Sequence, residues 1–168
     1  GLNEVDKELM RFFYGSFNII SGTPGAGKST WVQEQIADSG GVWCSRDQVR
    51  FSLLNDGEDY FAKENLVIST WINNIQAALD DENGPDDIYI DATHLTKKSR
   101  NNTLNALNLE NTQVIAVNFI VPLDICLHRN DFRKGRAFVP HSVIRRMFYT
   151  FEPATEAEKF AEIINITE

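Results

Sequence analysis

The sequence predicts an α/β fold in which a mainly parallel sheet is flanked by helices. Three observations predict it. An apolar run over 17–21 leads through a glycine-rich turn into a helical pattern. Strand-like and helix-like segments then alternate along the rest of the chain, as in folds with parallel strands. Turns containing glycine or proline separate these segments, for example at 83–85.

Each element follows from its residue pattern. Residues 1–14 carry apolar residues at near-helical spacing and are expected to form a lead-in helix, so that 15–168 make one domain. Apolar residues recur at helical spacing over 60–79, which predicts a long amphipathic helix. Strands are expected over 17–21, 42–45, 87–91, 112–121 and 163–166, and further helices after the glycine-rich turn, over about 97–108, from 122 to 130 and through 144–148.

Length and composition place the chain among ordinary globular proteins. Its 168 residues are enough for one domain with a real core. The hydrophobic share of 42% is typical, and no apolar run approaches the length of a membrane span. Two cysteines, Cys44 and Cys126, show no metal-type spacing. We therefore expect a reduced, cytoplasmic protein that does not bind membranes.

The charge of the chain is unevenly distributed. The net charge is −8, which is unfavourable for nonspecific binding to nucleic acid. Residues 92–150, however, hold nine of the 16 Lys and Arg residues and only three of the 24 Asp and Glu residues. This basic block predicts binding of a polyanion at one defined place.

The glycine-rich turn has the pattern G-x-x-x-x-G-K-[ST], the P-loop. It consists of Gly22, Thr23, Pro24, Gly25, Ala26, Gly27, Lys28, Ser29 and Thr30. Its glycines let backbone N–H groups approach phosphate oxygens, and the following helix adds the positive end of its dipole. Lys28, expected to be exposed, would contact the outer phosphates, and the Ser29 hydroxyl would ligate Mg²⁺. A strand before the turn and a helix after it favour this interpretation over a chance match.

Asp91 ends the strand expected over 87–91. In a parallel sheet, ligands bind at the carboxyl ends of the strands, where the P-loop also lies. Asp91 therefore has the position of a Walker B carboxylate that holds Mg²⁺ opposite Ser29. The alternative is a helix cap, because Asp91-Ala92-Thr93 precedes a predicted helix.

Asp47 follows the strand expected over 42–45 and is a candidate general base. A kinase that acts on a hydroxyl needs a group that accepts its proton as the new phosphorus–oxygen bond develops. Arg50 lies three residues later, on the same side if the segment is helical, and could hold a phosphate of the acceptor. The alternative is a surface ion pair between neighbouring charges.

Three arginines form a short basic run within 129–139, which we expect to be a small lid. Arg129, Arg133 and Arg136 are spaced around Gly135. Arginine suits the binding of phosphate oxygens and the stabilisation of transition-state charge. A mobile arginine-bearing lid would also exclude water from a P-loop. The alternative is a solvated basic loop.

Taken together, these motifs resemble the kinase domain of phage-type polynucleotide 5′-hydroxyl kinases, a family of small P-loop ATP-binding kinases. The resemblance covers residues 18–151. It depends on the P-loop, on Arg46-Asp47-Gln48-Val49-Arg50, on Asp91-Ala92-Thr93-His94-Leu95, and on Arg129-Asn130 leading to Val139-Pro140. The lid departs from the family pattern, because 130–135 is one residue longer.

The resemblance implies a role for each matched residue. Asp47 would be the general base, and Arg50 would bind the acceptor's 3′-phosphate. Asn130 would lie near the nucleotide base, and a lid arginine would contact the γ-phosphate. Because the lid is longer than in the family, that arginine is either Arg133 or Arg136.

The sequence therefore predicts a kinase that uses ATP, or another nucleoside triphosphate, and Mg²⁺. The expected acceptor is the 5′-hydroxyl of a DNA or RNA end. One alternative is a kinase of a nucleoside, another small molecule or a hydroxymethylated DNA base; another is a nucleotide-binding module without catalysis. The residues leave open the choice between ATP and GTP, the oligomeric state, and whether the chain comes from a longer protein.

Overall fold

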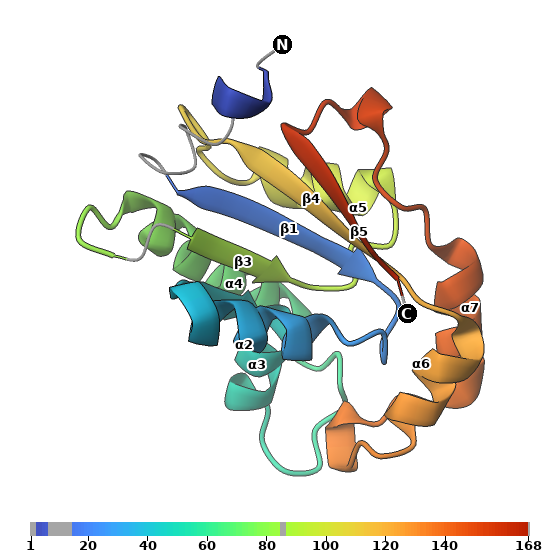
Figure 1. The fold of residues 1–168 in the computed structure, drawn as a ribbon. Coiled ribbons are helices and arrows are strands. Elements are labelled where there is room, and N and C mark those ends of the chain that lie inside the picture. The colour runs from blue at the N-terminus through green and yellow to red at the C-terminus, as the bar shows by residue number, and fades with distance from the viewer. Residues whose placement is uncertain (1–2, 7–14, 85–86, 168) are drawn as a thin grey trace.

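Five parallel strands form one sheet in the computed structural model, which describes residues 3–6, 15–84 and 87–167 (Figure 1). Their order is β2-β3-β1-β4-β5, and every neighbouring pair is parallel. The strands are β1 Ser16–Gly22, β2 Val42–Ser45, β3 Asp87–Asp91, β4 Val114–Ile120 and β5 Glu162–Thr167. The predicted parallel α/β sheet is thus confirmed, and each expected strand forms within two residues of its predicted ends.

Helices connect the strands. They are α2 Lys28–Ser39, α3 Arg46–Leu53, α4 Glu64–Asp80, α5 Lys97–Asn105, α6 Leu123–Asn130 and α7 His141–Thr150, with 3-10 turns at Gly135–Ala137 and Glu156–Glu158. No helix within the described ranges is long and apolar enough to cross a membrane. Most of the expected lead-in helix over 1–14 lies outside the described residues.

The long helix begins later than predicted. α4 starts at Glu64 rather than near Tyr60, and the residues before it form turns. The Phe61 side chain is 62% exposed and does not belong to the buried face of the helix. Tyr60 instead bonds to Asp47 of α3, so a tertiary contact overrides the helical pattern at this end.

Both faces of the sheet are buried under helices. On β4, Ile115, Val117 and Phe119 pack in one cluster with residues of α2, α6 and α7. On β3, Ile88 and Ile90 pack in a second cluster with Trp71 and Ile75 of α4. Successive side chains of a strand point to opposite faces, which explains the alternation. Figure 1 shows α2 in front of the sheet and α4 and α5 behind it.

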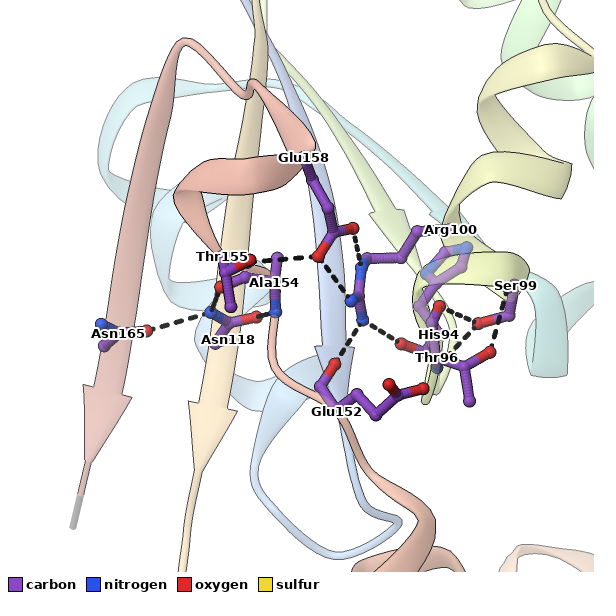
Figure 2. A network of polar contacts seen from close by, with 10 residues as sticks. All are labelled: His94, Thr96, Ser99, Arg100, Asn118, Glu152, Ala154, Thr155, Glu158 and Asn165. Carbon is purple, nitrogen blue, oxygen red and sulfur yellow. Dashed lines mark hydrogen bonds and ion pairs between the residues drawn. The ribbon is translucent and has the colours of Figure 1, made fainter.

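Polar contacts attach the segment before β5 to α5 and the sheet (Figure 2). The fully buried Arg100 donates to both carboxylate oxygens of Glu158, each at 2.9 Å, and to the carbonyl oxygens of His94 and Glu152. The side chain of Asn118 bonds to both backbone groups of Ala154. These contacts hold the last part of the described chain against the sheet.

Candidate active site

The P-loop runs from β1 into α2 along a path that requires glycine. Gly25 has φ +85°, and a Cβ atom added there would lie 2.3 Å from the carbonyl oxygen of Cys126. Gly27 has φ +93° and packs against the Arg129 guanidinium. Both are left-handed conformations that L-residues with a side chain rarely adopt. The loop therefore lies tightly against α6, with the N-terminus of α2 directly after it.

Lys28 is buried at the base of this loop, so the expectation of an exposed lysine was wrong. Its Nζ donates to the carbonyl oxygens of Gly22 at 2.8 Å and Thr23 at 2.9 Å, because the loop wraps around its own lysine. Burial lowers the pKa of Lys28 to about 8, and the charge of Arg133 lowers it further while Asp91 opposes the shift. The ammonium group is thus poorly compensated by the protein, which favours the approach of an anion.

Ser29 and Asp91 meet as the sequence predicts. The Ser29 hydroxyl donates to Oδ2 of Asp91 at 2.8 Å, and the Trp43 indole N–H donates to the same oxygen at 2.9 Å. The alternative role of Asp91 as a helix cap is wrong, because Thr96 caps α5. Trp43 was not singled out in the sequence, since a tryptophan in a buried strand gives no local sign that its N–H orients a carboxylate.

The donor set at this point fits Mg²⁺. A hydroxyl and a carboxylate are hard oxygen ligands of the kind that Mg²⁺ prefers, and Mg²⁺ usually takes its other ligands from water and phosphates. The part of the chain that the structure describes contains no cluster of three or more His, Cys, Asp or Glu residues suited to a metal. Ser29 and Asp91 would therefore hold the ion only together with a nucleotide.

Asp47 is fixed at one oxygen and exposed. Its Oδ1 accepts from Nη1 of Arg50 at 2.5 Å and from the hydroxyl of Tyr60 at 2.6 Å. The side chain is nevertheless 54% exposed and lines the largest pocket at the site. No hydrogen bond within the described residues engages its Oδ2. The predicted i, i+3 contact with Arg50 is thus present, on the helix α3.

Arg50 is placed differently from the expectation that it binds an acceptor phosphate. It is 2% exposed, and its Nη2 donates to both carboxylate oxygens of Glu64 at 2.7 and 2.6 Å. Its Nη1 donates to Asp47 and Tyr60, and its guanidinium lies 4.1 Å from the Tyr60 ring centroid. Burial alone would lower the pKa of Arg50, but the bond to Glu64 outweighs it and raises the pKa. With these donors engaged, Arg50 is suited to holding Asp47.

A pocket of about 440 Å³ joins these groups. The polar and charged residues around it are Lys28, Ser29, Ser45, Arg46, Asp47, Arg50, Tyr60, Glu64, Asp91, Thr93, Arg133 and Arg136. Its apolar lining comes from Pro24, Phe61, Ala92, Phe138, Val139, Pro140, Val143 and Met147. Tyr60, Phe61 and Glu64 were not identified from the sequence as site residues, because only the folded chain brings the turns before α4 next to α3.

The segment 131–140, between α6 and α7, is the lid, and it contacts the loop 54–63 across the pocket. Arg136 donates from Nη2 to the carbonyl oxygen of Asn55 and, at 3.1 Å, to that of Glu58. In Figure 1 the orange lid and the teal loop after α3 lie side by side. The Arg133 side chain also lines the pocket and lies near enough to Lys28 to affect its pKa. The structure therefore separates the two arginines: Arg136 bonds to the loop, and Arg133 lies by the P-loop lysine.

Arg129 and Asn130, the other residues expected to bind nucleotide, have different surroundings. Arg129 donates to the carbonyl oxygen of Ala26 at 3.0 Å and lines a second cavity, of about 280 Å³, beside Gly27 and Thr30. Asn130 is fully buried and exchanges two hydrogen bonds with the backbone of Val139. Asn130 is thus committed to closing the base of the lid, whereas Arg129 lies where a nucleotide bound to the P-loop would pass.

Comparison with known proteins supports this architecture. A family model described as an AAA domain matches residues 18–154, most of the chain. Several solved structures of P-loop kinases also match, each at less than 25% sequence identity, and so show the shared fold.

Two of these structures come from RNA kinases or RNA repair. One is described as the structure of the Pnkp1/Rnl/Hen1 RNA repair complex, with 23% identity and a TM-score of 0.67 over 87% of this chain and 50% of that chain. Another is a fungal RNA kinase, with 16% identity and a TM-score of 0.61 over 90% of this chain and 38% of that chain. The present chain spans half or less of the length of these two proteins.

A third match is a small-molecule kinase. It is a gluconokinase from Sinorhizobium meliloti, with 13% identity and a TM-score of 0.57 over 92% of this chain and 83% of that chain. The fold is thus shared by kinases of very different acceptors.

Proposed function

Because the chain belongs to the family of AAA domains and has the P-loop kinase fold, we propose that it is an ATP- and Mg²⁺-dependent phosphotransferase acting on a hydroxyl group, with the 5′-hydroxyl of a DNA or RNA end as the acceptor. The observation that carries this proposal is the presence of Asp47 in the same pocket as Lys28, Ser29 and Asp91. A protein that only binds nucleotide needs no carboxylate held beside its P-loop.

The reaction follows from the placement of these groups. The acceptor hydroxyl gives its proton to the free Oδ2 of Asp47 while its oxygen bonds to the γ-phosphorus and the bond to the β-phosphate oxygen breaks, leaving ADP. Hydrogen bonds from Arg50 and Tyr60 to Oδ1 keep the carboxylate oriented during this transfer. Lys28 and Arg133 stabilise negative charge on the transferred group. Bound Mg²⁺, held through Ser29 and Asp91, would neutralise charge on the phosphates.

The lining of the pocket supports a nucleotide end as the acceptor. Phe61 and Phe138 are 62% and 42% exposed and line the pocket from the loop and from the lid. Exposed aromatic side chains provide stacking surfaces for nucleobases. A small sugar carries many hydroxyls that would each need a polar partner, and an apolar lining leaves such groups unpaired. The basic block over 92–150 adds a surface for the rest of a polyanion.

A direct transfer assay tests the proposal. γ-labelled ATP is offered with single-stranded DNA or RNA bearing a 5′-hydroxyl, with nucleosides, and with gluconate. We expect label on the oligonucleotides, and a rate that falls as salt is raised, because phosphate contacts compete with counterions. Transfer only to a neutral small molecule, without salt dependence, would reject the polynucleotide acceptor. Binding of ATP without transfer to any acceptor would reject catalysis.

A further inference from the structure

The Arg46 guanidinium is the anomaly in the pocket. Arg46 is the first residue of α3 and lines the pocket beside Asp47. Its Nε is buried without a hydrogen-bond partner, and no bond or ion pair with another described residue engages its terminal nitrogens. Buried polar groups are nearly always bonded, so an unbonded guanidinium nitrogen calls for an explanation.

The carboxylates around Arg46 are already committed. Both oxygens of Glu64 and one oxygen of Asp47 bond to Arg50, and Asp91 accepts from Ser29 and Trp43. Burial and the neighbouring Arg50 charge lower the pKa of Arg46, although arginine stays charged at neutral pH. The pocket therefore contains a cation that the protein itself does not neutralise.

The position of Arg46 is nonetheless well defined. Its guanidinium lies 5.4 Å from the centroid of the Trp71 ring, and Trp71 is itself 1% exposed and bonded to the carbonyl oxygen of Cys44. This contact fixes one side of the guanidinium by a cation–π interaction. A planar group held in this way offers its N–H edge to an anion with little loss of entropy.

We propose that Arg46, rather than Arg50, is the residue that binds a phosphate of the acceptor. This inference rests on the proposed function, because it assumes that the acceptor hydroxyl contacts Asp47. A phosphate bound one residue away then belongs to the same acceptor molecule, as the 3′-phosphate of its first nucleotide. Lys28 and Arg133 supply the positive charge on the ATP side of the pocket. Arg50 holds the base, and Arg46 holds the acceptor.

Binding of thymidine 3′-monophosphate measures this site without requiring phosphoryl transfer. The protein is first saturated with a non-hydrolysable ATP analogue and Mg²⁺, and the affinity for the 3′-monophosphate and for thymidine is determined by calorimetry. We expect Arg46→Gln to weaken 3′-monophosphate binding about 10- to 100-fold, as for the loss of charge-assisted hydrogen bonds. Thymidine binding should change little. Arg46→Lys should retain part of the affinity, since it keeps the charge but loses the planar edge.

The matched control is Arg145→Gln on the exposed side of α7, which should leave both affinities unchanged. Thermal melting shows whether each variant is folded; if Arg46→Gln is not, the comparison of Arg46→Lys with the wild type decides. Unchanged 3′-monophosphate binding in a folded variant would overturn the inference. So would a loss confined to the ATP analogue, which would place the γ-phosphate at Arg46.

Transfer assays separate this inference from the proposed function. In the wild type, kcat/KM should be higher for the 3′-monophosphate than for thymidine, and Arg46→Gln should remove that preference. If the wild-type protein binds the 3′-monophosphate through Arg46 but phosphorylates no acceptor, the proposed function fails and the binding site stands. If it phosphorylates both acceptors and Arg46→Gln leaves their ratio unchanged, the function stands and the site is rejected.

Discussion

The Ser29 hydroxyl lies 2.8 Å from the Asp91 carboxylate, although 62 positions separate the two residues. The parallel pairing of β1 with β3 brings them together, because Ile20 is in register with Asp91. The P-loop serine and the strand-ending acid therefore reach the same point at the carboxyl edge of the sheet. This arrangement leads to the first of five predictions.

Removing either residue should raise the Mg²⁺ concentration needed for activity. For Ser29→Ala and Asp91→Asn we expect a lower rate at limiting Mg²⁺, with partial recovery at high Mg²⁺, because one oxygen ligand is lost from the ion. The rate is measured as a function of Mg²⁺ at saturating ATP. Ser39→Ala, at the exposed end of α2, is the control. An unchanged Mg²⁺ requirement in both site variants would show that the pair is structural.

Asp47→Asn should abolish proton acceptance while preserving the fold. The amide keeps the size of the side chain but not its basicity, so we expect kcat to fall about 10²- to 10⁴-fold. ATP affinity and the melting temperature should change little, because the side chain is half exposed. Single-turnover transfer and thermal melting on one preparation test this. Asp56→Asn, in the exposed loop 54–63, is the matched control, and an active Asp47→Asn protein would mean that another group is the base.

The two lid arginines should behave differently. Arg133 lies near Lys28, so Arg133→Ala should lower kcat at least about a thousandfold, as for a residue that stabilises transition-state charge. Arg136 bonds to Asn55 and Glu58, so Arg136→Ala should loosen the lid and raise the KM of the acceptor more than it lowers kcat. Steady-state kinetics of both variants are compared. The reverse result would assign the phosphate contact to Arg136, and two near-normal kcat values would make the basic run a solvated loop.

ATP binding should take up a proton above pH 8. Burial lowers the pKa of Lys28 to about 8 in the nucleotide-free protein, whereas phosphate contact requires the charged ammonium. As pH rises above 8, binding must first protonate Lys28, so ATP affinity should fall, by up to about tenfold per pH unit. Calorimetry at pH 8.5 in two buffers with different ionisation enthalpies measures the uptake. Lys28→Arg keeps its charge and should take up none; the same uptake in both proteins would identify a different group.

Glu158→Gln should destabilise the protein strongly. It removes the carboxylate paired with the fully buried Arg100 (Figure 2), which costs about 3–5 kcal/mol of unfolding free energy for a broken buried pair. Urea unfolding measures the loss, and the neighbouring exposed Glu156→Gln is the control. A loss below about 1 kcal/mol, the range of a surface pair, would contradict the prediction.

The same pair has a defined pH dependence. Burial opposes ionisation of Glu158, but its bonds from Arg100 and the backbone of Thr155 outweigh this and lower its pKa. The stabilisation is therefore fully present above the ordinary carboxyl pKa and is lost as pH falls through the lowered one. Wild type and Glu158→Gln should converge in stability at low pH.

Local sequence was enough to predict the architecture and part of the site. The alternation of strand and helix patterns predicts the parallel sheet, and the P-loop pattern predicts a strand, a glycine turn and a helix, because these depend on contacts within a few residues. The position of Asp91 at the end of β3 and the i, i+3 contact of Asp47 with Arg50 follow from the same local rules.

Only the tertiary structure decided how the charges are divided among partners. Glu64 and Tyr60 surround Arg50, Trp43 orients Asp91, and Arg136 reaches a loop about 80 positions away. Whether a guanidinium is neutralised or left for a ligand depends on which carboxylates the fold brings within hydrogen-bonding distance. Neighbouring arginines of one helix, Arg46 and Arg50, look alike in the sequence, and long-range packing alone makes one a support and leaves the other unpaired.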